Sequence, residues 1–218
     1  MAARFSPARN RVRANGLLLG AIVIHNLTYP LSGAGMPWPA LFYAFYASIF
    51  VFGTWALSGS GGLRAGMAGI GLAVLAAGLA KSCDPGPAAA LAVYLSSILY
   101  HLGMGVVLVR YTFSGRQVMT DVLLAATSLY LVIGSGFAAL LGLIEWAAPG
   151  SFVAGSGVPV GWQQLLYFSY VTMTTVGYGD ITPVGFYAQS VAAFEAIGGT
   201  LYSVLLLSRL VGLHASRE

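Results

Sequence analysis

The sequence predicts an all-α integral membrane protein, and three observations support this fold class. Of the 218 residues, 58% are hydrophobic and only 7% are charged, whereas a soluble domain carries about 25% charged residues. The mean hydropathy is +0.82. Six apolar segments have lengths near that of a membrane-spanning helix, which needs roughly 20 residues. The net charge of +4 is therefore a guide to membrane topology, and we expect no nucleic acid partner.

The six apolar segments are the candidate transmembrane helices. They cover residues 15–31, 39–57, 65–80, 88–109, 118–144 and 184–211. The third segment is short, and it lies between turn-forming stretches rich in Gly, Pro and Ser. Small residues four apart predict that one face of this third segment packs closely against another helix. These residues are Ala65, Gly69, Ala73 and Ala77.

The first segment also has a second interpretation. An arginine-rich start, the apolar run LLLGAIVI and small residues at Ser32 and Ala34 fit a secretory signal peptide. Cleavage would leave the later helices in the same orientation, so both interpretations stay open.

The loop charges predict the topology. Six crossings with both termini inside would leave only Lys81 outside the cell. The cytoplasmic set would be Arg4, Arg9, Arg11, Arg13, Arg64, Arg110, Arg116, Arg209 and Arg217. This asymmetry follows the positive-inside rule. We therefore expect a multi-pass protein of the cell membrane, surrounded by lipid, with a basic cytoplasmic N-terminus at residues 1–14 and a cytoplasmic C-terminus. The preference for arginine over lysine hints at a bacterial source.

A short apolar stretch and a polar motif lie between the fifth and sixth segments. Residues 162–173 are too few to span a membrane, so we interpret them as a re-entrant half-helix. The motif TTVGYGD follows at residues 174–180. Non-helical backbone at membrane depth is tolerated only where protein buries it or where it lines a watery path.

The glycines of this motif allow an unusual backbone. Gly177 and Gly179 can adopt positive φ cheaply, which would aim successive carbonyls the same way. Oxygens from Thr175, Val176, Gly177 and Tyr178 would then form a column. Four such columns around an axis could replace the water shell of a dehydrated cation. The C-terminal end of the half-helix favours a cation through its partial negative charge, and Asp180 adds negative charge at the mouth.

Residues 117–213 resemble the two-helix pore module of bacterial potassium channels. The resemblance rests on TTVGYGD together with the outer helix 118–144, the half-helix WQQLLYFSYVTM, the tripeptide ITP and the inner helix 184–211. It implies a tetrameric pore, with potassium ions as permeant ligand and no cofactor. It assigns the ion path to Thr175, Val176, Gly177, Tyr178 and Gly179. One filter per chain implies a homotetramer.

The resemblance also implies roles on the inner helix. Gly198 and Gly199 stand where the family bends this helix to gate, although close helix packing also explains the pair. Thr200, Ser203 and Leu207 fall on one helix face, which we expect to line the central cavity.

Two positions around the filter depart from the family pattern. Phe168 stands where many members have a tryptophan that donates to the filter aspartate. Either Tyr167 or Tyr170 replaces this donor, or Asp180 is held less firmly. Val171 stands where some members have a glutamate. Thr174 and Asp180, at the two ends of the motif, complete the expected filter support.

Glu195 lies in the middle of the sixth segment, where a carboxylate is costly and suggests function. It lies about 140° around the helix from Thr200. We therefore expect a protonated carboxyl that hydrogen-bonds the half-helix, for instance at Thr172 or Thr174. A direct role in conduction or pH gating stays open.

Residues 15–110 are similar to a voltage sensor in helix count only. Voltage sensing needs several arginines on a membrane helix, and the fourth segment has none before Arg110. His101 on this segment is either a packing histidine or a pH sensor. Three roles stay open for these helices: they brace the pore, fix the geometry of the oligomer, or hold a regulatory site. The gating stimulus is also open.

The sequence favours a potassium-selective passive channel over the alternatives. A coupled transporter subunit would carry four degenerate loops, whereas this chain has one intact loop. A non-conducting scaffold or regulatory subunit, or a weakly selective cation channel, would keep the same motif. An enzyme is not supported, because no nucleophile or phosphate-binding motif appears and Cys83 is the single cysteine. No soluble substrate is expected.

Overall fold

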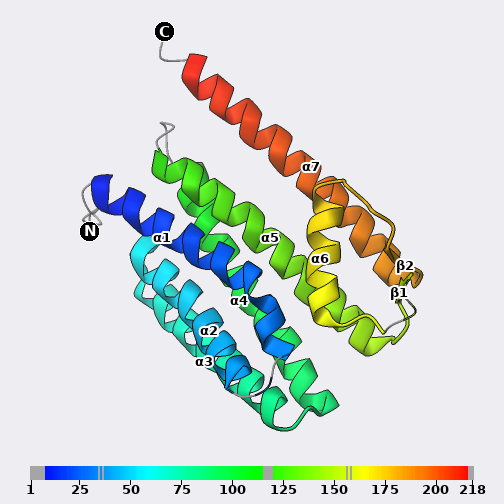
Figure 1. The fold of residues 1–218 in the computed structure, drawn as a ribbon. Coiled ribbons are helices and arrows are strands. Elements are labelled where there is room, and N and C mark those ends of the chain that lie inside the picture. Colours follow the sequence, from blue (N-terminus) through cyan, green and yellow to red (C-terminus); the bar gives the residue numbers. More distant parts are fainter. Residues whose placement is uncertain are drawn as a thin grey trace. The chain divides into compact units, whose positions relative to one another are not determined.

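The structure is a computed structural model that describes residues 8–33, 35, 37–114, 120–155, 157 and 159–215. Its elements are α1 (Ala8–Leu27), the 3-10 helix η1 (Tyr29–Gly33), α2 (Trp38–Leu57), α3 (Gly61–Cys83), α4 (Pro87–Ser114), α5 (Thr120–Ala147), β1 (Phe152–Ala154), α6 (Trp162–Met173), β2 (Ile181–Pro183) and α7 (Phe186–Ala215) (Figure 1). The predicted all-α fold is confirmed. Arg4, Ala34, Arg116 and Arg217 of the sequence interpretation lie outside the described residues.

The chain divides into two compact units, Met1–Val132 and Ile133–Glu218. The division falls inside α5, between Val132 and Ile133. The predicted functional boundary between residues 110 and 117 stays a prediction.

Five described helices are long and apolar enough to cross a membrane. They are Trp38–Leu57, Gly61–Cys83, Pro87–Phe113, Thr120–Ala147 and Phe186–Arg209. Helix α1 is not among them, since it carries Arg11, Arg13 and His25. It nevertheless lies antiparallel along α2. Leu18 is next to Gly53, and the ring of His25 stacks on that of Phe42 with centroids 4.5 Å apart. A sixth crossing by α1 therefore stays our prediction.

An aromatic and histidine cluster joins the helices of the first unit. His101 Nδ1 lies 2.7 Å from the Ser97 carbonyl oxygen and 3.2 Å from the Tyr46 hydroxyl. The Tyr100 hydroxyl donates to the Ala47 carbonyl. Because His101 is buried with its Nδ1 hydrogen-bonded, the structure favours the packing interpretation of this residue.

The packed face of α3 differs from the sequence prediction. Of the predicted small residues, Ala65, Gly69 and Ala73 are exposed in the single chain and Ala77 is buried. The prediction was therefore wrong within the chain for three of the four positions, because the buried glycines of α3, Gly71 and Gly78, lie on the face that large neighbouring side chains contact. The ring of Tyr43 lies directly over Gly78, and the side chain of Val51 and the Tyr100 hydroxyl lie close to Gly71.

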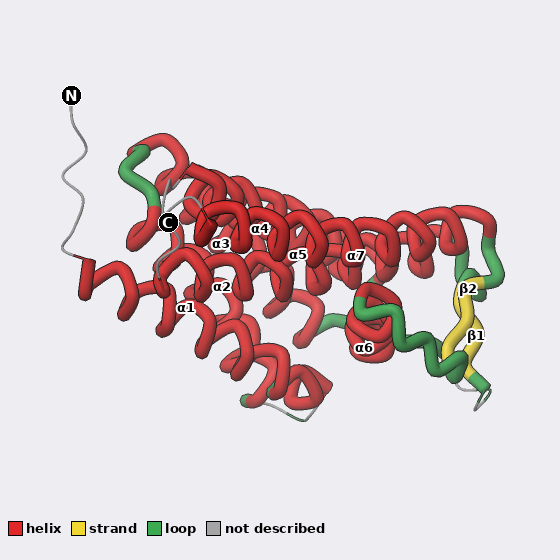
Figure 2. Tube along the Cα trace, turned by 90° about the horizontal axis from the view of Figure 1, so that it is seen from above, coloured by secondary structure: helices red, strands yellow, loops and turns green. Residues whose placement is uncertain are grey.

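In the second unit, a short two-stranded sheet lies beside the half-helix. Strands β1 and β2 pair antiparallel, with Phe152 opposite Pro183 and Ala154 opposite Ile181. Helix α6 packs against α7, which also contacts β2 (Figures 1 and 2). The shared core consists of Leu141, Phe152, Ala154, Val160, Leu165, Phe168, Ile181, Ala188 and Ala192.

Substitution of Gly78 by Ala tests the close contact of α3 with α2. A Cβ at Gly78 would overlap the ring of Tyr43, and overpacking of this kind costs about 1–3 kcal/mol. We expect a lower thermal unfolding midpoint in detergent. Gly69→Ala on the same helix is the control, because a Cβ there meets no atom within 4 Å. Equal midpoints for both variants would contradict the described contact.

Candidate functional site

Helix α6 is the predicted half-helix and has the predicted bounds. At its start, the Gln164 Oε1 atom accepts a hydrogen bond from the Gly161 amide at 2.7 Å. At its end, the Thr174 hydroxyl donates to the Tyr170 carbonyl at 2.6 Å. Gly134 of α5 has no side chain, which leaves room for the Tyr170 ring. The half-helix is thus capped at both ends and packed against α5.

The backbone that follows α6 alternates in handedness. Thr175, Gly177 and Gly179 have φ values of 61°, 57° and 76°, respectively. Val176 and Tyr178 between them do not have positive φ. The two glycines were predicted to adopt this region, and Thr175 was not, since positive φ is rare for a β-branched residue. Thr175 lies two residues before Gly177, and this regular two-residue spacing could have indicated its positive φ.

The amides at the start of this segment are satisfied by α6. Val176 and Gly177 donate their N–H groups to the Val171 carbonyl at 3.0 and 3.3 Å. The Thr175 amide donates to the Thr172 carbonyl at 2.9 Å. Within the described part of the chain, no backbone donor bonds the carbonyls of residues 175–179. These oxygens are therefore available to a cation, while Val171 contributes its backbone rather than an acidic side chain.

Asp180 is held at three atoms. Its Oδ2 accepts a hydrogen bond from the Tyr167 hydroxyl at 2.9 Å, and its Oδ1 accepts from the Ile181 amide at 3.1 Å. Its carbonyl accepts from Gly155 at 2.8 Å. The rings of Tyr167 and Tyr178 stack with centroids 6.4 Å apart. The hydrogen bond to Asp180 raises the pKa of Tyr167. Of the two tyrosines predicted to replace the missing tryptophan, Tyr167 supplies the donor.

Phe168 lies in the core and not at the aspartate. It is buried and packs edge-on against Phe152, with ring centroids 5.4 Å apart.

Glu145 orders the loop between α5 and β1, because its two carboxylate oxygens accept hydrogen bonds from the amides of Gly150 and Phe152 at 2.8 and 3.0 Å. No local sequence pattern around Glu145 indicated this role.

Glu195 is fully buried between two helices. Its Oε1 lies 2.5 Å from the Ser169 hydroxyl, which lies 2.6 Å from the Gly134 carbonyl. One hydroxyl carries one proton, so Ser169 cannot donate to both oxygens. A protonated Glu195 that donates to Ser169, which donates to Gly134, satisfies this arrangement. The predicted contact with the half-helix is present, but the partner is Ser169 rather than Thr172 or Thr174.

The two inner-helix glycines differ in their surroundings. A Cβ at Gly199 would overlap the Met173 carbonyl, whereas one at Gly198 meets no atom within 4 Å. Gly199 therefore permits close packing at the end of α6, and a hinge at Gly198 stays a prediction because α7 is continuous through it. The predicted cavity face is exposed in the single chain. It comprises Thr200, Ser203 and Leu207.

Comparison with known proteins identifies this region. Residues 118–213 match the family model described as ion channel. The inward rectifier potassium channel Kirbac3.1 of Paramagnetospirillum magnetotacticum is 38% identical over 79 residues, which cover 34% of this chain. This region is therefore similar to ion channel domains and, in the aligned part, to a potassium channel. The matched region contains the half-helix, the alternating backbone and α7, and the match indicates a channel rather than an enzyme.

The similarity is limited to part of each protein. The aligned residues cover 23% of the length of the Kirbac3.1 chain. No solved structure matches the chain.

Removal of the Tyr167 hydroxyl should weaken the filter mouth. Tyr167→Phe leaves Asp180 without its side-chain donor, so we expect a lower potassium-over-sodium permeability ratio in bilayer recordings. Tyr187→Phe is the matched control, because its side chain is 82% exposed in the single chain. An unchanged ratio for Tyr167→Phe would show that the hydrogen bond does not support the filter.

Glu195→Gln should preserve assembly and selectivity, because the amide can still donate to Ser169. Bilayer recordings measure this effect. Loss of all current in a correctly assembled Glu195→Gln protein would contradict a hydrogen-bonding role.

Ser169→Ala should destabilise the domain by about 1–3 kcal/mol, since it leaves a buried carboxyl without its partner. Thermal unfolding in detergent measures this effect.

Proposed function

We propose that this chain forms a homotetrameric, potassium-selective channel that conducts passively. The observation that carries the proposal is the alternation of positive φ at Thr175, Gly177 and Gly179, combined with carbonyls that accept no backbone hydrogen bond in the described chain. Rings of such oxygens replace the hydration shell of potassium in known filters. The ion-binding positions are Thr175, Val176, Gly177, Tyr178 and Gly179.

The exposed apolar surface of the second unit supports assembly. Val176 and Tyr178 are 53% and 70% exposed, and Phe194 and Leu201 on α7 are 67% and 53% exposed. Such surfaces need either lipid or other copies of the chain to cover them. Because one chain supplies one filter segment, four copies are required to surround an ion.

The remaining assignments follow from chemistry and charge. Potassium is the permeant ligand, and the conduction path needs no cofactor or soluble substrate. The arginine distribution supports a multi-pass orientation in the cell membrane, with both termini in the cytoplasm.

A reversal potential under opposed potassium and sodium gradients tests the proposal in planar bilayers. We expect reversal near the potassium equilibrium potential, with block by barium. Reversal midway between the two equilibrium potentials would indicate a weakly selective cation channel. Silence at every pH and voltage from a verified tetramer would indicate a non-conducting scaffold.

Gly177→Ala should abolish selective potassium current. A Cβ at Gly177 meets no atom within 4 Å in the single chain, so a steric clash would not cause the loss of current. The cause would be the φ of 57° at this position, which is unfavourable for a residue with a Cβ. Gly105→Ala is the control, because this helical glycine also has open space and no positive φ. Normal potassium selectivity in Gly177→Ala would refute the filter assignment.

A further inference from the structure

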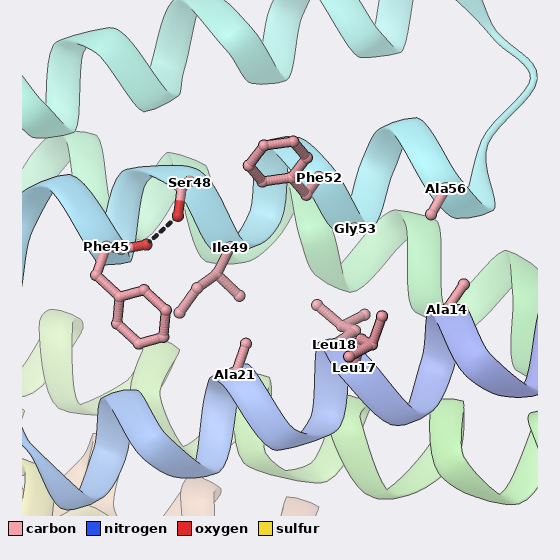
Figure 3. A pocket seen from close by; sticks show the side chains of 10 residues that line it. All are labelled: Ala14, Leu17, Leu18, Ala21, Phe45, Ser48, Ile49, Phe52, Gly53 and Ala56. Atoms are coloured by element: carbon pink, nitrogen blue, oxygen red, sulfur yellow. Dashed lines mark hydrogen bonds between the residues drawn. The ribbon is translucent and has the colours of Figure 1, made fainter.

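An apolar groove runs between α1 and α2 in the first unit (Figure 3). Its volume is about 520 Å³. It is lined by Ala14, Leu17, Leu18, Ala21, Phe45, Ser48, Ile49, Phe52, Gly53 and Ala56. Neither the ion channel domain nor its proposed conduction path uses these residues.

The lining of the groove suits a hydrocarbon chain. Ser48 is its only hydroxyl residue, and this hydroxyl already donates to the Phe45 carbonyl at 2.7 Å. Leu17 and Phe52 on the two rims are 75% and 72% exposed. Helix α2 has the length and composition of a membrane span, so the groove lies at a depth where lipid tails are the surrounding solvent.

One end of the groove carries unpaired positive charge. Ala14 and Ala56 mark this end (Figure 3). Arg13 is exposed and lies one helical turn before Leu17, on the same side of α1. The Arg64 Nη2 atom donates to the Trp55 carbonyl at 2.8 Å, beside Ala56, and its guanidinium lies 5.5 Å from the centroid of the Trp55 ring.

Neither guanidinium has an acidic partner among the described residues. The Nε–H group of Arg64 is buried and donates to no hydrogen-bond partner in the described chain. The described acids are engaged or remote from this end. Asp121 bonds Tyr111, and Asp84 follows the far end of α3. The acids of the second unit, Glu145, Asp180 and Glu195, bond residues of their own unit.

We propose that this groove binds an anionic phospholipid of the bilayer. One acyl chain lies between α1 and α2, and the phosphate lies at Arg13 and Arg64, which donate to its oxygens. Trp55 lies at the headgroup level, where tryptophan is enriched in membrane proteins. A second copy of this chain fits less well, because Asp84 is the one described acid whose side chain bonds no other residue, and a single carboxylate cannot neutralise both arginines.

Native mass spectrometry of the full chain in detergent tests the proposal. Phosphatidylglycerol and phosphatidylcholine with identical acyl chains are titrated separately, and bound lipid and oligomeric mass are read from the same spectra. We expect preferential binding of phosphatidylglycerol. Each arginine near a phosphate contributes about a fivefold change in affinity, so Arg13→Gln and Arg64→Gln should each weaken phosphatidylglycerol binding by about that factor. Arg110→Gln removes the same charge outside the groove lining and should have no effect.

A second variant tests the acyl-chain part. Ala21→Phe fills the middle of the groove without changing any charge, and it should weaken phosphatidylglycerol binding while the oligomeric mass stays the same. Equal binding of the two lipids, or arginine variants that bind like the wild type, would indicate ordinary boundary lipid and overturn the proposal. Disulfide crosslinks between copies in Leu17→Cys or Phe52→Cys proteins would show that another chain covers the groove and would also overturn it.

Discussion

The hydrogen bonds from Val176 and Gly177 to the Val171 carbonyl are the constraint on which the candidate filter depends. Backbone amides at membrane depth need an acceptor within the protein, and the last carbonyls of a helix have no donor within the helix itself. The end of α6 and the start of the filter therefore satisfy each other. Since the amides are bonded backwards along the chain, the carbonyls of the next residues remain available for an ion.

The half-helix must in turn be fixed from several sides. Ser169 connects it to Gly134 of α5 and to Glu195 of α7, and Gly199 allows the Met173 carbonyl to approach α7. Tyr167 connects it to Asp180 beyond the filter. A neutral carboxyl suits Glu195, because its proton and that of Ser169 each then have an acceptor, while the buried Oε2 atom, which has no hydrogen-bond partner in the described chain, carries no charge. The filter geometry is thus a property of the whole second unit.

Local patterns predicted much of this arrangement. The half-helix bounds and the positive φ of Gly177 and Gly179 followed from segment length and glycine spacing. The specific partners did not, because Ser169 and Glu145 make contacts that depend on the relative placement of helices and loops. Thr175 was missed because its residue type argues against positive φ. On α3 the small-residue spacing indicated Gly69, whereas Tyr43 packs on Gly78, since the size of the facing side chains decides which face is buried.

The most direct test of the filter assignment is a crystal structure with rubidium or thallium in place of potassium, measured by anomalous scattering. The account predicts a column of anomalous peaks on a fourfold axis, each surrounded by oxygens of Thr175, Val176, Gly177 or Tyr178 from four chains. An ordered filter without such peaks, or peaks bound only by side chains elsewhere, would contradict the claim that this backbone binds the permeant ion.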